Sequence, residues 1–256
     1  MTSEIRSTDD RAVSALLFEP YGVLLDIETD ERDWYAYLHL SRFLEYRGVR
    51  LSADELRWLW FEGAAAQTQR PEESYPDIAA RRIWQQVLEG RMAHCAWPGD
   101  LDPVTLVADV TVLHRALTRR TLRLMDGARA MLEALSPHVR LGIVTDSQPE
   151  YILPELRTTG IGGYFRVVVV SGAHGYRKPD PRLFRRALAD LAAPAEEALF
   201  VGVDTGRDIT GAAAVGMRTA LALTPYGSKD IALGEPDFVV DSPEDLLSLP
   251  GLAHLT

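Results

Sequence analysis

The sequence is poor in cysteine, and its one cysteine is Cys95. A lone cysteine excludes an intramolecular disulfide and a metal cluster held by thiolates. Long apolar runs are also missing: no stretch of about 18 residues is apolar enough to suggest a membrane span, and residues 1–12 lack the apolar segment of a signal peptide. These absences predict a cytoplasmic protein in a reducing compartment, with no membrane partner.

Positive charge is also scarce. Lys and Arg number 27 against 37 Asp and Glu, which gives a formal net charge of −10. A field of this sign repels nucleic acid and anionic membranes, so we expect no polyanion partner. The rest of the composition is that of a globular protein. The chain is 46% hydrophobic and 25% charged. Its length of 256 residues is sufficient for one large domain or two.

Short, continuous apolar runs recur in the chain, each bounded by turn residues. Continuous apolarity is typical of strands covered on both faces, and segments with helical spacing lie between these runs. The alternation predicts an α/β fold with a doubly wound parallel sheet. The predicted strands are 15–18, 139–145, 165–171, 198–203 and 218–223, and the predicted helices are 128–135, 149–158, 181–191 and 208–215.

The segment from about residue 31 to residue 120 has a different pattern. It is rich in Leu, Ala, Arg and Trp at helical spacing and contains no convincing strand. We therefore predict a discontinuous core domain, 13–28 and 121–256, interrupted by an all-helical domain at 29–120. The helices expected in this insertion are 34–47, 53–69, 76–89 and 103–119.

Polar residues directly follow several predicted strands. The carboxyl ends of parallel strands share one edge of an open sheet, and ligands bind at that edge. The sequence therefore predicts a site in which acids, a hydroxyl and a lysine converge. The residues concerned are Glu19, Tyr21, Thr145, Asp146, Lys178 and the segment 204–208.

Four segments resemble the motifs of the haloacid dehalogenase superfamily. The most specific are 177–181 (RKPDP) and 201–217 (VGVDTGRDITGAAAVGM), while 18–26 (FEPYGVLLD) and 143–146 (IVTD) resemble the first two motifs. The resemblance covers nearly the whole chain. It implies a Rossmann-like hydrolase core with a final strand at 236–240, and it implies that the helical insertion is a cap that covers the site and selects the substrate.

The resemblance also implies roles for individual residues. A carboxylate on the first loop, at the position of Glu19, attacks the substrate in this family. The hydroxyl of the second loop and the lysine of the third loop, here Thr145 and Lys178, hold developing negative charge. Acids on the fourth loop bind magnesium when phosphate is transferred.

The first and fourth motifs depart from the family pattern. Glu19 replaces the aspartate nucleophile, and the extra methylene moves the carboxylate by roughly an ångström, which slows an in-line attack by about 10²-fold. Tyr21 replaces the second aspartate of the phosphatases, and a phenol with a pKa of about 10 is a poor acid and base at neutral pH. The fourth motif can be aligned with either Val203 or Asp204 at the magnesium-ligand position. We expect no metal, or magnesium bound weakly by Glu19, Asp204 and Asp208.

The candidate catalytic residues are Glu19, Tyr21, Thr145 and Lys178. Each also has a structural interpretation: Glu19 as the ion-pair partner of Lys178, Tyr21 as a ring packed under the cap, and Thr145 as a strand-end cap. Asp208 likewise has an alternative role as a helix N-cap. We expect Lys178→Ala to slow a reaction and to leave folding intact.

The candidate substrate-binding residues are Asp146, His174 and Tyr35, the last as one of several aromatic side chains expected in the cleft.

Three functions remain open. We favour a divergent enzyme of the family that acts on a small organic substrate by metal-independent acid/base or electrostatic catalysis. The second is a non-catalytic binding protein. The third is a magnesium phosphatase, or a hydrolase similar to the 2-haloacid dehalogenases, whose D-x-Y-G-T motif has threonine where this chain has Val23.

The expected partner is a small molecule whose anionic or polarised oxygen lies against Lys178 and Thr145. The sequence sets neither the substrate nor the oligomeric state.

Overall fold

The centre of the molecule is a six-stranded sheet with the order β5-β4-β1-β6-β7-β8. The computed structural model describes residues 12–89, 91 and 102–255. Every neighbouring pair in this sheet is parallel, so the predicted doubly wound α/β class is confirmed. The strands are β1 (Ala15–Phe18), β4 (Arg140–Thr145), β5 (Phe165–Val170), β6 (Ala198–Gly202), β7 (Arg218–Ala222) and β8 (Phe238–Val240).

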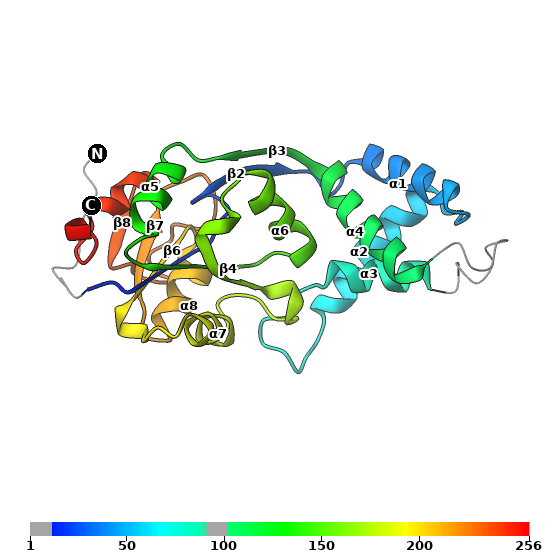
Figure 1. Cartoon of the computed structure of the whole chain (residues 1–256). Helices are drawn as coiled ribbons and strands as arrows, with labels where there is room; N and C mark the ends of the chain where they lie inside the picture. The colour runs from blue at the N-terminus through cyan, green and yellow to red at the C-terminus, as the bar shows by residue number, and fades with distance from the viewer. Residues whose placement is uncertain (1–11, 90, 92–101, 256) are drawn as a thin grey trace.

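Helices cover both faces of this sheet (Figure 1). Leu16 and Phe18 of β1 belong to one hydrophobic cluster, with α5 (Ala128–Leu135) and α6 (Pro149–Thr158). Ala15 and Leu17 belong to the cluster on the opposite face, with α7 (Pro181–Leu191) and α8 (Thr210–Ala213). Alternate strand residues point to opposite faces, so a continuous apolar run serves both cores.

Four helices form a separate bundle beside the sheet domain (Figure 1). Their own hydrophobic cluster contains Trp60 and Trp84, whose rings stack with centroids 5.1 Å apart. Asp33, Ser52 and Asp102 accept backbone hydrogen bonds at three of the helix N-termini, which fixes where those helices begin. The helices are α1 (Trp34–Tyr46), α2 (Ala53–Thr68), α3 (Ala80–Leu88) and α4 (Pro103–Thr118).

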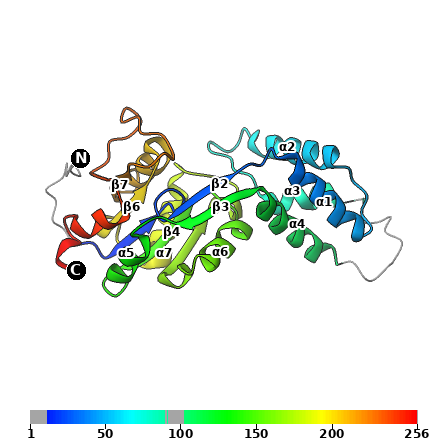
Figure 2. The same cartoon turned by 90° about the horizontal axis from the view of Figure 1, so that it is seen from above.

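An antiparallel ribbon joins the bundle to the sheet domain (Figure 2). It consists of β2 (Leu25–Thr29) and β3 (Arg119–Leu124), and the ion pair of Arg123 with Asp26, 2.6 Å long, links the two strands. The sequence pattern does not predict this ribbon, because both strands are half exposed and carry charged residues among the apolar ones. The predicted domain limits at 28/29 and 120/121 fall within it.

Two predicted helices have other bounds than expected. The segment expected as helix 76–89 is helical only from Ala80, because residues 75–78 make hydrogen bonds to loops of the sheet domain instead. The helix expected at 208–215 is divided into a π-helical turn, Thr205–Ile209, and the short α8. No helix in the described part of the chain is long and apolar enough to cross a membrane.

Candidate active site

Four segments at the carboxyl edge of the sheet bring four polar side chains into contact. Glu19 follows β1 and Thr145 ends β4. The Thr145 hydroxyl donates to Glu19 Oε1 at 3.0 Å, and Lys178 Nζ donates to Glu19 Oε2 at 2.5 Å. Lys178 Nζ also donates to Asp208 Oδ1 at 2.6 Å. We call these residues, Glu19, Thr145, Lys178 and Asp208, the acid–lysine cluster.

The acid–lysine cluster is buried, with exposed fractions of 6% for Glu19 and 2% for Lys178. Burial raises the pKa of the Glu19 carboxyl, and the attraction of Lys178 opposes that shift. Burial also disfavours the charged form of Lys178, but Asp208 and Glu19 outweigh it and raise the pKa of the ammonium above its usual value. Lys178 is therefore a permanent positive charge between two carboxyl groups.

The fourth-motif loop turns its two acids in different directions. Asp208 Oδ2 accepts from the backbone N–H groups of Val203 and Asp204, at 2.8 and 3.0 Å. The Asp204 carboxylate instead accepts from the backbone of Arg207 at 2.9 Å and of Ser228 at 3.0 Å. Burial acts to raise the pKa of Asp204, but these hydrogen bonds outweigh it and lower the pKa below the usual value. Asp208, and not Asp204, is the acid that joins Lys178.

This arrangement does not fit a magnesium ion. Magnesium requires several oxygen ligands in near-octahedral geometry. Glu19 and Asp208 are both bound to the Lys178 ammonium, Asp204 faces the loop at Ser228, and Val203 is buried in a hydrophobic cluster. Within the described ranges, no group of three or more His, Cys, Asp or Glu side chains is placed to hold a metal.

Tyr21 connects the site to the helical insertion. Its backbone N–H donates to Glu19 Oε1 at 3.1 Å, while its hydroxyl donates to Glu155 Oε2 at 2.6 Å and lies 3.1 Å from Ser147 Oγ. Glu155 also accepts from Arg115 Nε of α4 at 2.8 Å. Burial, and then the Glu155 charge, raise the pKa of Tyr21, so this phenol stays neutral. Sequence reasoning missed Arg115, Ser147 and Glu155, because no local pattern predicts contacts between the insertion and the sheet domain.

Asp146 supports the third loop. Its Oδ1 accepts from the Lys178 backbone N–H at 2.9 Å, and its Oδ2 lies 3.7 Å from Arg207 Nη1. Burial raises the pKa of Asp146 to about 6. In this position Asp146 orients the backbone of the loop that contains Lys178.

The structure does not bring Tyr35 or His174 to the acid–lysine cluster. Tyr35 is 65% exposed in the first turn of α1, because the adjacent Ala36 and Tyr37 take the buried face of that helix. His174 is exposed and lies against the Tyr176 ring, with ring centroids 5.7 Å apart. Neither residue enters the function proposed below.

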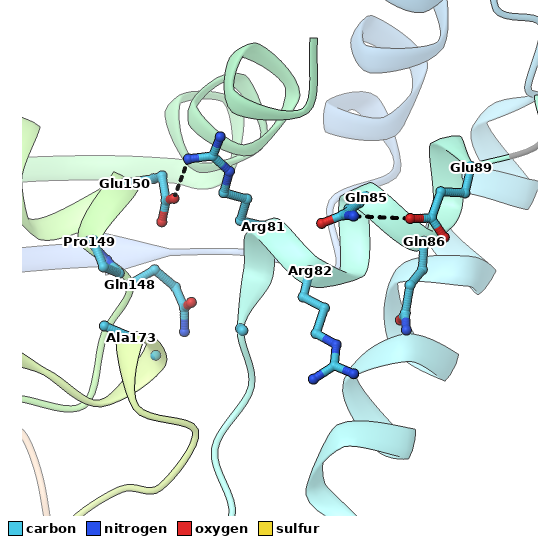
Figure 3. A pocket seen from close by; sticks show the side chains of 11 residues that line it. Arg81, Arg82, Gln85, Gln86, Glu89, Gln148, Pro149, Glu150 and Ala173 are labelled. Atoms are coloured by element: carbon cyan, nitrogen blue, oxygen red, sulfur yellow. Dashed lines mark hydrogen bonds and ion pairs between the residues drawn. The ribbon is translucent and has the colours of Figure 1, made fainter. Parts of the chain in front are cut away.

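An open cleft lies between α3 and the start of α6 (Figure 3). Its volume is about 550 Å³, which is within the range of small-molecule sites. Gln148 and Gly172 line it from the sheet domain, and Arg81 lies 3.7 Å from Glu150 across it. Sequence reasoning missed this cleft, although Gln148 follows the second motif by only a few residues.

Comparisons with known proteins place this architecture in a family. The model for haloacid dehalogenase-like hydrolases matches residues 101–222. Pyrophosphatase PpaX of Anoxybacillus flavithermus is 33% identical over 140 residues, which are 54% of this chain and 63% of the relative. Glyceraldehyde 3-phosphate phosphatase of Pyrococcus abyssi is 39% identical over 99 residues, 38% of this chain and 42% of the relative. The chain spans about half the length of the curated relatives it matches.

Solved structures match the fold over nearly the whole chain. A 2-haloacid dehalogenase from Pseudomonas syringae pv. Tomato DC3000 has a TM-score of 0.63 at 17% identity, covering 95% of this chain and 100% of that one. A HAD phosphatase from Thermococcus onnurineus has a TM-score of 0.58 at 22% identity, covering 94% and 99%. The fold defines an α/β protein with a helical insertion. The predicted resemblance to the haloacid dehalogenase superfamily is confirmed by the family model over residues 101–222 and by the shared fold.

Proposed function

We propose that the chain is a hydrolase that acts on a small organic molecule with an anionic or polarised oxygen, without a resident magnesium ion. The observation that carries this proposal is the acid–lysine cluster itself. Lys178 neutralises Glu19 and Asp208 at 2.5 and 2.6 Å, in the place where a metal would need both carboxylates. The relatives support hydrolysis as the class of reaction, since they include a pyrophosphatase and phosphatases that act on small phosphorylated molecules.

We assign Glu19 the role of general base. Burial raises the pKa of its carboxyl, and a base whose pKa lies nearer to neutrality accepts a proton from water more effectively. Lys178 and the Thr145 hydroxyl are the donors that stabilise negative charge on the substrate oxygen. The neutral Tyr21 hydroxyl stays bound to Glu155 and closes the side of the site that faces the insertion.

A chromogenic phosphate ester, assayed with and without magnesium, tests metal independence. We expect negligible turnover in both conditions, because the acid–lysine cluster leaves no set of carboxylates for the metal. Robust turnover that chelator and Glu19→Gln both abolish would replace this proposal with a magnesium phosphatase.

A panel of 2-haloacids, carboxylate esters and phosphate esters, monitored by mass spectrometry, tests the hydrolase class. We expect metal-independent turnover of at least one class, lost in Glu19→Gln. For a 2-haloacid, a single turnover in H₂¹⁸O separates the base from a nucleophile, because water that hydrolyses a Glu19 ester at its carbonyl carbon leaves label in the peptide containing Glu19.

A second candidate is a non-catalytic binding protein. One observation favours it: the Glu19 carboxylate already accepts hydrogen bonds from Thr145 and Lys178, the donors that a substrate anion would use. Panel molecules that are retained by the protein and recovered unchanged by mass spectrometry would support this candidate against the enzyme.

A further inference from the structure

One segment of the helical insertion is bound to both loops that carry the charge-holding residues. This segment, residues 75–80, leads into α3 and is named here the seam segment. The backbone N–H of Arg177 donates to Tyr75 O at 2.8 Å, and the N–H of Asp77 donates to Gly175 O at 3.0 Å. Lys178 is the next residue after Arg177. The seam segment is therefore paired with the lysine loop through its backbone.

The same segment is fastened to the loop of Thr145 by one side chain, that of Gln148. Gln148 Nε2 donates to Ile78 O at 2.9 Å, and the N–H of Ala80 donates to Gln148 Oε1 at 2.9 Å. The Gln148 residue is only 5% exposed. The oxygen and the NH₂ group of its carboxamide thus both form hydrogen bonds with the backbone of the insertion, as the backbone of a neighbouring strand would.

Gly172 gives the Gln148 side chain the room for this arrangement. A Cβ at residue 172 would lie 2.3 Å from Gln148 Oε1, which is far inside van der Waals contact. The backbone of Gly172 also donates to Ser147 O at 3.0 Å. A glycine at this position is required for the observed placement of Gln148, and it provides a second way to disturb it.

One loop of the sheet domain borders the open cleft at one end and contacts the acid–lysine cluster at the other. Gln148 and Gly172 line the cleft, while the preceding residues of the same loop, Thr145 and Ser147, contact Glu19 and Tyr21. Glu19 and Lys178 are almost completely buried. Gln148 thus lies in the loop that joins the border of the cleft to the buried cluster.

We propose that Gln148 is a positioning residue that locks the insertion onto the site and gates passage from the cleft to the acid–lysine cluster. The gate concerns the site of the proposed function, but the lock itself does not depend on turnover. Closure at Gln148 holds the Thr145 and Lys178 loops against one common segment, so it fixes the two charge-holding donors relative to each other.

Amide hydrogen exchange tests the lock in the full chain. Gln148→Met keeps the length of the side chain and removes both hydrogen bonds, so we expect exchange at Ala80 to accelerate by at least about tenfold. Exchange at Asp77 and Arg177 should accelerate as well, while amides of β4 keep their wild-type rates. Gln85→Met is the matched control, because Gln85 lines the same cleft but its side chain donates to Glu89, the C-cap of its own helix.

Two further variants keep the test decisive if Gln148→Met folds poorly. Gly172→Ala leaves Gln148 in the sequence but displaces its carboxamide, so it should produce the same exchange pattern. Gln148→Glu retains the acceptor for the Ala80 N–H and loses the donor to Ile78, so it should be intermediate. Wild-type exchange at Ala80 in the folded variants would overturn the proposal.

Kinetics on whichever substrate the panel identifies tests the gate. If Gln148 gates access, Gln148→Met should speed the arrival of substrate at the cluster, while the loss of positioning lowers kcat, with partial rescue in Gln148→Glu; unchanged kinetics would refute the gate. If no molecule is turned over but exchange at Ala80 accelerates, the lock stands and the proposed hydrolase function fails.

Discussion

The most consequential residue of the site is Lys178, because its ammonium is buried between Glu19 and Asp208. A buried charge that loses its partner destabilises a fold far more than an exposed one. The motif alone predicts that Lys178→Ala leaves folding intact. The geometry corrects this expectation, since the variant would leave two carboxyl groups facing each other without a counter-charge.

We expect Lys178→Ala to lower the free energy of unfolding at pH 7 by about 3–5 kcal/mol. Urea denaturation followed by circular dichroism measures the change. Adding Glu19→Gln to the variant removes one unpaired charge and should recover part of the loss. Wild-type stability in Lys178→Ala would show that the cluster is not held as described.

Val203 stands where the site would need a carboxylate in order to bind a metal. It follows β6 directly, and Asp208 bonds to its backbone, so a carboxylate there would join Asp208 and Glu19 at the strand ends. The paired change Val203→Asp with Glu19→Asp should create a Mn²⁺ site measurable by titration calorimetry. Val203→Leu with Glu19→Asp is the packing control and should not. Equal Mn²⁺ affinity in the wild type would contradict our assignment of the fourth motif.

Much of this cluster could be predicted from the sequence, and the reason is geometric. Glu19 and Thr145 each stand at the end of a buried strand, and Lys178 lies in a loop at the same edge, so parallel topology alone brings them together. The direction in which Asp204 points could not be predicted, because it depends on hydrogen bonds from Ser228, a residue far along the chain. The same holds for Gln148, whose partners belong to another domain.

Among the elements, α4 carries the group that makes the insertion sensitive to acid. His114 is packed against Tyr37, Trp60 and Trp84, with ring centroids 4.4 to 5.5 Å away. Burial lowers its pKa to about 3, and Arg115 adds to the shift. His114 therefore binds a proton near pH 6.5 in the unfolded chain, whereas in the folded chain it stays neutral at that pH.

The contribution of His114 to stability is complete above about pH 6.5 and is lost as the pH falls toward 3, by up to about 1.4 kcal/mol per pH unit. His114→Gln should show a shallower loss of unfolding free energy between pH 6.5 and 4 than the wild type. The comparison of slopes cancels the contributions of Glu19 and Asp146, which both proteins share. Parallel curves would disprove the buried neutral histidine.

The ribbon of β2 and β3 shows where element prediction reaches its limit. Its strands are too polar to resemble the buried strands of the sheet. They are also too short to show a clear alternation of apolar and polar residues. The ribbon is stabilised by cross-strand pairs such as Asp26 with Arg123, which exist only once the two distant segments meet. The helices of the insertion, in contrast, were predictable from their spacing and from capping residues such as Ser52.

At the scale of the whole molecule, the chain has two structural units with separate hydrophobic interiors. The sheet domain has a cluster on each face of its sheet, and the insertion has its own cluster around Trp60 and Trp84. Apart from the ribbon, the units meet at the seam segment, at the ion pairs of Arg115 with Glu155 and of Arg81 with Glu150, and where Tyr151 of α6 packs into the cluster of the insertion. Limited polar contacts of this kind couple domains weakly.

Weak coupling predicts that the insertion unfolds before the sheet domain. Every tryptophan of the chain lies between residues 34 and 97, so tryptophan fluorescence reports on the insertion alone. In urea, we expect the fluorescence transition to precede the circular dichroism transition, which includes the sheet. Tyr151→Ala removes the side chain that bridges the two interiors and should widen the separation, because the smaller cluster loses a buried neighbour. Coincident transitions in both proteins would instead establish one cooperative unit, and the seam would then be strong enough to keep the site closed in all but globally unfolded molecules.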